Sequence, residues 1–306
     1  MLTGLYLATR RSIRNIVVRS PLLKRSLGGM LVRIDILLRK AGILNSVKSR
    51  TEFTVHGATF AYGESDVGIA EFVLTNGDYE EETRKVVMQT LKPGDVFFDL
   101  GANIGYFTVL AAKRVGPTGR VFAFEPTPAT RFYLERNAQG NGVSGVVAVE
   151  AFAISERRGI AYFHVGNQSE CNSIATDAQS AAVTIEVKTI GIDEYCEEKG
   201  VARVDMIKMD IEGQELKAIR SMSATNQRNP QLQIIFEYNA EVVRRSGEGV
   251  AEFFDLLSSY GFSRFTVLLP EPVSFKSGAD LRFLEILAEG YNPNILASKE
   301  SAPRRV

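Results

Sequence analysis

The sequence predicts a doubly wound α/β fold whose central sheet is mostly parallel and Rossmann-like. Apolar segments of strand length alternate with amphipathic segments of helix length, which is typical of a parallel sheet covered by helices on both faces. One apolar segment, residues 96–100, runs into a glycine-containing turn that opens a helix. With 306 residues, 45% of them hydrophobic, the chain is long enough for one large core and an appendage.

A basic segment occupies the start of the chain. Residues 1–50 contain eleven Lys and Arg but only one acidic residue, Asp35, whereas the rest of the sequence is net acidic. Apolar residues fall at helical spacing between the arginines, so we predict a basic helical appendage over residues 1–50 and a single domain over residues 51–306. Three interpretations of the appendage are open: a cap packed on the domain, a contact with an anionic membrane or lipid, and an organellar presequence.

The helices and strands of the domain are predicted from the spacing of apolar residues and from turn-forming residues between them. A hairpin is predicted from strands 52–55 and 58–62, and then an amphipathic helix over 80–91. The alternating part is expected to have strands at 96–100, 121–124 and 146–149 and helices from about 104 to 115 and 128 to 140.

The alternation breaks at Ala153. Segments 159–165 and 182–189, joined by the polar loop 166–180, predict an inserted β-hairpin whose loop is a candidate for choosing the substrate. The doubly wound pattern resumes with strands 204–209 and 232–236 around a helix at 214–222. The tail is expected to add a helix at 249–260 and strands near 264–269 and 281–287.

The turn after the strand at 96–100 predicts a nucleoside site without a pyrophosphate. It reads D-L-G-A-N-I-G, so Gly101 and Gly105 are four residues apart and Asn103 stands where a dinucleotide loop needs a further glycine. Glu125 closes the next strand twenty residues after Gly105, at the separation at which a carboxylate accepts both hydroxyls of a ribose. The predicted ligand is therefore a nucleoside cofactor, and its closest approach is to the glycine backbone.

Further carboxylates are expected at the same edge of the sheet. In open α/β sheets the ligand lies at the carboxyl ends of the strands, and those ends carry Asp99, Glu125, Asp210 and Glu237. Four acidic groups at one edge are costly unless a cationic ligand meets them.

Composition excludes several classes of protein. The sequence has two cysteines and two histidines, Cys171, Cys196, His56 and His164, in no spacing that predicts a zinc site or a disulfide framework. The formal net charge is zero, which argues against nucleic acid as a partner. No apolar run reaches the length of a membrane span and no secretory signal is evident, so a cytoplasmic protein is expected.

Four segments resemble those of a known family. In chain order they are D-L-G-A-N-I-G-Y-F, F-E-P-T-P, I-K-M-D-I-E-G-Q-E and I-I-F-E-Y-N. With them, over about residues 75–240, the sequence resembles the FkbM family of S-adenosylmethionine-dependent methyltransferases. The resemblance implies a sheet of the class I methyltransferase type, S-adenosyl-L-methionine as cofactor, and methylation of a hydroxyl on a sugar, glycan, lipid or secondary metabolite.

The resemblance also assigns roles to residues of this sequence. The methionine part of the cofactor would meet Asp99, Gly101, Ala102, Asn103 and Gly105, the ribose would meet Glu125, and the adenine would meet Phe152, Ala153 and Ile154. The catalytic candidates are Asp210 as first choice for a base, Glu212 as second, and Lys208, which shares a strand face with Asp210. Glu215, at the end of the same motif, is expected to be a solvated charge at a helix start.

Other interpretations stay open at this stage. A nucleotide-linked oxidoreductase on the same sheet and a non-catalytic adenosyl-binding module are the alternatives to a methyltransferase. His164 is a weaker candidate for the base. A magnesium-assisted reaction would draw on carboxylates at the strand ends, but nothing in their spacing demands a metal and none is predicted.

Overall fold

The computed structural model of the chain describes residues 51–63, 67–165, 173–174, 183–239, 250–276, 284 and 292–300. The predicted appendage over residues 1–50 lies outside this part, as does most of the polar loop 166–180. No helix among the described residues is long and apolar enough to cross a membrane.

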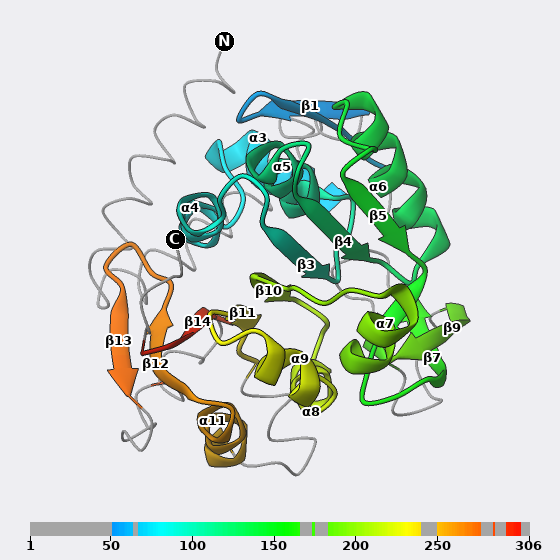
Figure 1. Cartoon of the computed structure of the whole chain (residues 1–306). Helices are drawn as coiled ribbons and strands as arrows, with labels where there is room; N and C mark the ends of the chain where they lie inside the picture. Colours follow the sequence, from blue (N-terminus) through cyan, green and yellow to red (C-terminus); the bar gives the residue numbers. More distant parts are fainter. Residues whose placement is uncertain are drawn as a thin grey trace.

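An eight-stranded sheet with helices on both faces forms the centre of the domain (Figure 1). Its strands are ordered β13-β12-β14-β11-β10-β3-β4-β5. In chain order they are β3 (Val96–Leu100), β4 (Arg120–Phe124), β5 (Val147–Glu150), β10 (Met206–Met209), β11 (Gln233–Glu237), β12 (Phe262–Val267), β13 (Val273–Lys276) and β14 (Asn294–Lys299).

The order of the strands places a topological switch point between β3 and β10. From β3 the chain moves outward through β4 to β5, and it then returns to β10 and continues to β11 on the other side, with all of these neighbours parallel. The remaining strands, β14, β12 and β13, pair antiparallel. The predicted doubly wound, mostly parallel Rossmann-like fold is confirmed, and the switch point is where such sheets bind ligands.

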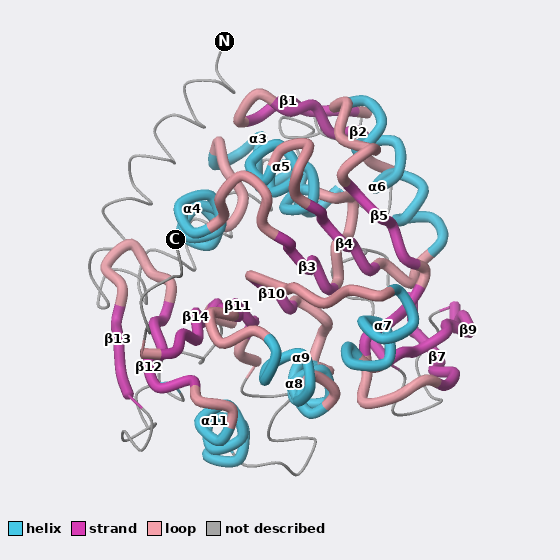
Figure 2. The backbone as a smooth tube through the Cα atoms, in the orientation of Figure 1, coloured by secondary structure: helices cyan, strands magenta, loops and turns pink. Residues whose placement is uncertain are grey.

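Side chains alternate between the two faces of the sheet and meet different helices. On β3, Phe97 packs with the first layer of helices and Phe98 with the second. The first layer comprises α3 (Val67–Asn76), α4 (Glu81–Thr90), α5 (Tyr106–Val115) and α6 (Pro128–Gly140). The second comprises α7 (Ile192–Lys199), α8 (Glu215–Arg220), α9 (Ser223–Arg228) and α11 (Val250–Ser259), and Figure 2 shows the two layers above and below the sheet.

The predicted hairpin at the start of the domain is confirmed as β1 (Glu52–Val55) and β2 (Ala58–Ala61). It is fixed to α6 through the buried side chain of Asn137, whose oxygen accepts from the backbone N–H of Ala61 at 2.7 Å and whose amide donates to the Ala61 carbonyl at 2.9 Å. The same amide donates to the Ile104 carbonyl at 2.8 Å, so one side chain joins the hairpin to the turn before α5.

The predicted insertion is confirmed and proves larger than a hairpin. Strands β7 (Gly159–Val165) and β9 (Val183–Ile190) pair antiparallel as expected. They belong to a four-stranded sheet, β6-β9-β7-β8, in which β6 (Phe152–Ile154) runs parallel to β9 and β8 (Ser173–Ile174) pairs with β7. Three helices were not predicted from the sequence: α3 near the start of the domain, α7 after this insertion, and α9, which follows the predicted helix at 214–222.

The tail of the chain differs from the expectation. Of the strand predicted near 281–287 only Leu284 is described, and it is buried. The strands that follow β12 are β13 and β14, and β14 lies antiparallel between β11 and β12. The pairing of β14 with the edges of β11 and β12 stabilises it as a strand, so its own short sequence does little to predict one.

Gly101 ends β3 where the backbone of β10 leaves the sheet. Its φ is +77°, and a Cβ on it would lie 1.9 Å from the backbone oxygen of Asp210. The sequence analysis assigned this glycine to the approach of a ligand, but the nearest obstacle to a side chain is the neighbouring strand end. Glycine is therefore needed at position 101 because the backbone at the end of β10 leaves no room for a Cβ.

We expect Gly101→Ala to lower the free energy of unfolding by about 3 kcal/mol or more, because a backbone clash adds to the cost of a left-handed alanine. Gly200 is the matched control, since its φ is +66° and nothing lies within 4 Å of a Cβ there. Gly200→Ala is expected to cost only about 1 kcal/mol. Urea unfolding measures both, and equal losses would contradict the role of the strand junction.

Candidate functional site

A cavity of about 320 Å³ lies at the carboxyl ends of β3, β4, β10 and β11, beside the switch point. Almost all of the residues predicted to form the site line it: Asp99, Gly101, Ala102, Asn103, Glu125, Phe152, Ala153, Ile154, Lys208, Asp210 and Glu212. Gly105 does not line the cavity. Its Cα faces Leu134 of α6, where a Cβ would lie 2.5 Å from the leucine Cδ1, so Gly105 serves the packing of α5 on α6.

Glu125 connects the two turns that border the cavity on the β4 side. Its Oε2 accepts from the backbone N–H of Asn103 at 3.1 Å, and its Oε1 accepts from the N–H of Thr127 at 2.8 Å. Asn103 is left-handed, with φ 50°, and its own Oδ1 accepts from the N–H of Ile104 at 2.7 Å. These two hydrogen bonds hold the carboxylate in one orientation at the border of the cavity.

Asp99 and Lys208 are lateral neighbours on β3 and β10, and both side chains face α5. Asp99 is buried; its Oδ2 accepts from the hydroxyl of Thr108 at 2.6 Å, and its Oδ1 has no hydrogen-bond partner among the described residues. The Nζ of Lys208 lies 3.0 Å from Asp210 Oδ2 and 4.6 Å from the ring centroid of Phe107.

A single buried ammonium thus meets several carboxylates. Burial by itself lowers the pKa of Lys208, but the charges of Asp210, Glu80 and Asp99 outweigh it and hold that pKa above its usual value. Burial raises the pKa of Asp99, and the nearby lysine only partly opposes this. Lys208 therefore stays charged and is the electrostatic centre of this wall of the cavity.

A second acidic group, Glu237, lies on the β11 side of the cavity and forms no ion pair with another residue of the described part of the chain. Burial raises the pKa of Glu237 to about 9, and the charges of Asp210, Glu212, Glu215 and Glu80 add to the shift. Glu237 lines the cavity at the carboxyl end of β11, next to Asp210 at the end of β10.

The expectation for Glu215 is wrong. Its side chain is only 5% exposed, and its Oε1 accepts from the backbone N–H of Ile211 at 3.1 Å. The chain turns back between these residues through left-handed Glu212 and Gly213, which brings the start of α8 against the strand end. Burial raises the pKa of Glu215 to about 7, so this group is not a solvated charge.

Glu80 does not line the cavity, but its charge acts on Lys208 and Glu237 there, which was not expected from the sequence. It was taken as the first residue of an amphipathic helix, but it precedes α4 in a left-handed conformation, with φ 43°. Its Oε2 accepts from the side-chain amide of Asn294 at 3.0 Å, and burial raises its pKa despite the charge of Lys208. The only signal in the sequence was the run of three glutamates at 80–82, which also fits an ordinary helix start.

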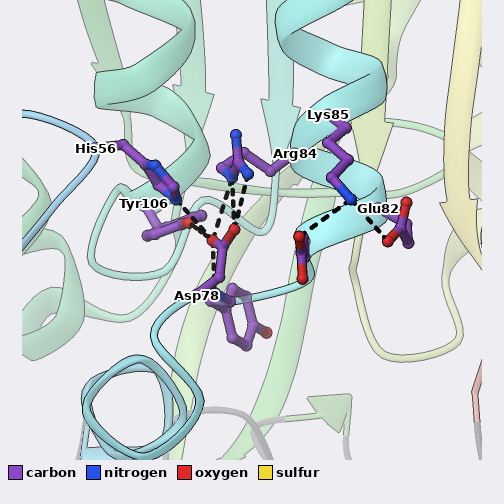
Figure 3. A network of polar contacts seen from close by, with 8 residues as sticks. His56, Asp78, Glu82, Arg84, Lys85 and Tyr106 are labelled. Atoms are coloured by element: carbon purple, nitrogen blue, oxygen red, sulfur yellow. Dashed lines mark hydrogen bonds and ion pairs between the residues drawn. The ribbon is translucent and has the colours of Figure 1, made fainter. Parts of the chain in front are cut away.

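A polar network behind the cavity fixes two of its aromatic walls (Figure 3). Asp78 accepts from the Tyr106 hydroxyl at 2.6 Å, from Arg84 Nε at 2.9 Å and from the backbone N–H of Tyr79 at 2.9 Å, and its Oδ1 lies 2.9 Å from His56 Nε2. Burial raises the pKa of Asp78, but Arg84, Tyr106 and His56 bring it below its usual value. The network joins the β1–β2 turn, α4 and α5, and Tyr79 and Tyr106 line the cavity.

Within the described ranges, no group of three or more His, Cys, Asp and Glu side chains is placed to hold a metal ion.

Comparison with known proteins identifies the family. The family model described as "Methyltransferase FkbM domain" matches residues 99–264, which is more than half of the chain. The chain belongs to the FkbM methyltransferase family. The resemblance stated from the four segments is thereby confirmed, and the chain carries an S-adenosylmethionine-dependent methyltransferase domain.

Members of the FkbM family and other methyltransferases are similar to this chain. The hexuronic acid methyltransferase AglP of Haloferax volcanii is 28% identical over 144 residues, which cover 47% of this chain and 56% of that protein. The 31-O-demethyl-FK506 methyltransferase FkbM of Streptomyces tacrolimicus is 27% identical over 202 residues, which cover 56% and 74%. The chain thus spans little more than half the length of AglP.

A solved structure of a SAM-dependent O-methyltransferase from Thermotoga maritima has a TM-score of 0.41 and 14% identity, with 83% of this chain and 87% of that chain covered.

The raised pKa values of the buried carboxyls predict how stability depends on pH. A carboxyl whose pKa is higher in the folded than in the unfolded state binds extra protons on folding, so its stabilisation is present at low pH and is lost as pH rises through the folded pKa. Because the pKa of Glu237 is raised to about 9, we expect the free energy of unfolding to fall between about pH 5 and pH 9.

Glu237→Gln should make this decline shallower by up to about 1.4 kcal/mol per pH unit, which is the slope for one proton. Urea unfolding across this pH range measures the effect, with the exposed Glu135→Gln of α6 as control. Parallel curves for wild type and Glu237→Gln would show that Glu237 ionises in the folded protein as it does in the unfolded chain.

Proposed function

We propose that this protein transfers the methyl group of S-adenosylmethionine to a hydroxyl oxygen of a sugar, glycan, lipid or secondary metabolite. The observation that carries the proposal is the cavity at the switch point, where carboxylates at four strand ends surround a space lined by apolar residues of β6. The name of one relative supports an oxygen acceptor, because it methylates 31-O-demethyl-FK506, and the name of another, a hexuronic acid methyltransferase, supports a sugar acid as a class of acceptor.

The residues present fit this cofactor. S-adenosylmethionine has a ribose with two hydroxyls, an adenine ring, a sulfonium cation and an amino-acid end with an ammonium group. The fixed carboxylate of Glu125 offers acceptors to the ribose hydroxyls, and the edge formed by Phe152, Ala153 and Ile154 offers an apolar contact to the adenine. Asp99 Oδ1 is buried beside the cavity without a partner in the described part of the chain, and it would accept from the ammonium.

The amino-acid end would also contact the turn formed by Gly101, Ala102 and Asn103, whose backbone borders the cavity. Gly105 would act on this turn only indirectly, through the packing of α5 against Leu134.

The chemistry asks mainly for positioning. When bound, the cofactor supplies a methyl group already activated by a positively charged sulfur. The protein has to hold the acceptor oxygen in line with that methyl carbon, and such positioning is worth about 7 to 11 kcal/mol. Asp210 and Glu212 border the cavity at the end of β10 and would contact the acceptor hydroxyl, while Lys208 fixes the Asp210 carboxylate.

The assignment of the ribose is tested at Glu125. We expect Glu125→Gln to weaken S-adenosylmethionine binding by about 2 kcal/mol, roughly 30-fold, because an amide leaves one ribose hydroxyl or one backbone N–H without an acceptor. Isothermal titration calorimetry measures the affinity, and thermal unfolding shows whether the variant is folded. Unchanged affinity in a folded Glu125→Gln protein would remove Glu125 from the cofactor site, and Glu135→Gln should bind as the wild type does.

The class of acceptor is tested by transfer of an isotope-labelled methyl group to a panel of hydroxyl compounds. We expect label in uronic acids, oligosaccharides or hydroxylated polyketides, with product mass raised by one CH₂ unit. Transfer to carboxyl or amine groups, with no transfer to any hydroxyl compound, would overturn the assignment of a hydroxyl acceptor.

A further inference from the structure

Glu237 and Asp210 are neighbouring carboxylates with different surroundings. The register pairs Met209 of β10 with Phe236 of β11, so the next residue of each strand, Asp210 and Glu237, stands at the same height of the cavity. Asp210 Oδ2 is occupied by the ammonium of Lys208 at 3.0 Å. None of the ion pairs between described residues involves Glu237.

The groups that face Glu237 from the surrounding elements are acidic. They are Asp210 at the end of β10, Glu212 in the following turn, Glu215 at the start of α8 and Glu80 before α4, and the neighbour on β14 is the uncharged Asn294. Lys208 is directed to Asp210, Glu80 and Asp99. Neighbouring carboxylates repel one another when ionised, which favours the protonated form of a group such as Glu237 that has no ion pair among the described residues.

Asp99 Oδ1 gives a second, independent sign that a cation belongs in this cavity. It is buried, lines the cavity and lacks a hydrogen-bond partner among the residues described. A buried carboxylate oxygen in this condition is costly unless a ligand donates to it. The ammonium group of the cofactor would supply such a donor, in addition to the charge of Lys208 beside Asp99.

We infer that Glu237 is the catalytic base that takes the proton of the acceptor hydroxyl, and that entry of the cationic methyl donor prepares it by releasing the proton that it holds in the free enzyme. The inference rests on the proposed function. The raised pKa of Glu237, about 9, agrees with it, because a carboxyl of this kind is protonated at neutral pH until positive charge arrives.

Methyl transfer to a hydroxyl moves one methyl group and releases one proton. The oxygen of the acceptor forms a bond to the methyl carbon, the bond from that carbon to sulfur breaks, and its electron pair stays on sulfur as a neutral thioether. The hydroxyl proton passes to the Glu237 carboxylate, which becomes a carboxylic acid. With the sulfonium charge gone, the surrounding carboxylates again favour the protonated acid, so the state of the free enzyme is restored when the products leave.

The test is calorimetric titration of the full chain with S-adenosylmethionine near neutral pH, in phosphate and in Tris, whose ionisation enthalpies differ. The difference in heat between the buffers gives the number of protons released. We expect about one proton for the wild type and close to none for Glu237→Gln. S-adenosylhomocysteine, which lacks the sulfonium charge, should release clearly less than S-adenosylmethionine.

Three outcomes would overturn the inference: wild type binding S-adenosylmethionine without proton release, Glu237→Gln releasing as many protons as wild type, or equal release with both ligands. Absence of any S-adenosylmethionine binding would instead overturn the proposed function itself. If Glu237→Gln does not fold, Glu237→Asp replaces it. The shortened carboxylate should still release a proton, but the difference in proton release between S-adenosylmethionine and S-adenosylhomocysteine should be smaller than in the wild type.

Turnover on an acceptor supplies the catalytic part of the test. Glu237→Gln should lower kcat about 100-fold or more and leave the KM for S-adenosylmethionine within a few-fold of wild type, whereas Glu135→Gln should leave both unchanged. An undiminished kcat in Glu237→Gln would show that a group other than Glu237 takes the proton of the hydroxyl.

Discussion

The buried ammonium of Lys208 is the constraint on which the site depends. It stands at the switch point between β3 and β10, where Asp99 lies beside it in register and Asp210 lies 3.0 Å away. Without this charge, the acidic groups at the strand ends would meet only one another, at a large desolvation cost. One lysine is nevertheless too few for all of them, and the remaining deficit of positive charge makes the cavity suitable for a cationic ligand. The same carboxylates thus lower the stability of the free protein and raise its affinity for a cationic cofactor.

The sequence was sufficient for the parts of the fold that local pattern specifies. Strand β3 and helix α6 have the predicted bounds, because a continuous apolar run and a proline-initiated amphipathic segment are complete signals in themselves. The residues gathered around the cavity were also largely predictable, since the carboxyl ends of parallel strands must meet at one edge of the sheet. This reasoning requires only the order of the strands, which the α/β alternation supplies.

What the sequence could not supply depends on contacts between distant segments. Glu80 and Asn294 are hydrogen-bonded to each other although they are 214 residues apart, so neither one's neighbourhood shows that it belongs to the site. Glu215 has the sequence of an exposed helix start, and only the left-handed turn before it reverses the chain and buries it. Gly101 lines the cavity, and a side chain on it would also meet the strand end at Asp210, a contact that the sequence pattern does not show.

The position of β14 has a consequence for how the protein is made. On the ribosome, β11 and β12 emerge before the strand that belongs between them, so both present unpaired edges until synthesis has passed Lys299. The parallel part of the sheet can form earlier, but the Asn294 amide that fixes Glu80 arrives only with this last strand. Until then, the nascent chain lacks both the pairing of β14 with β11 and β12 and the hydrogen bond from Asn294 to Glu80. During this interval, chaperones that cover exposed strand edges would be needed most.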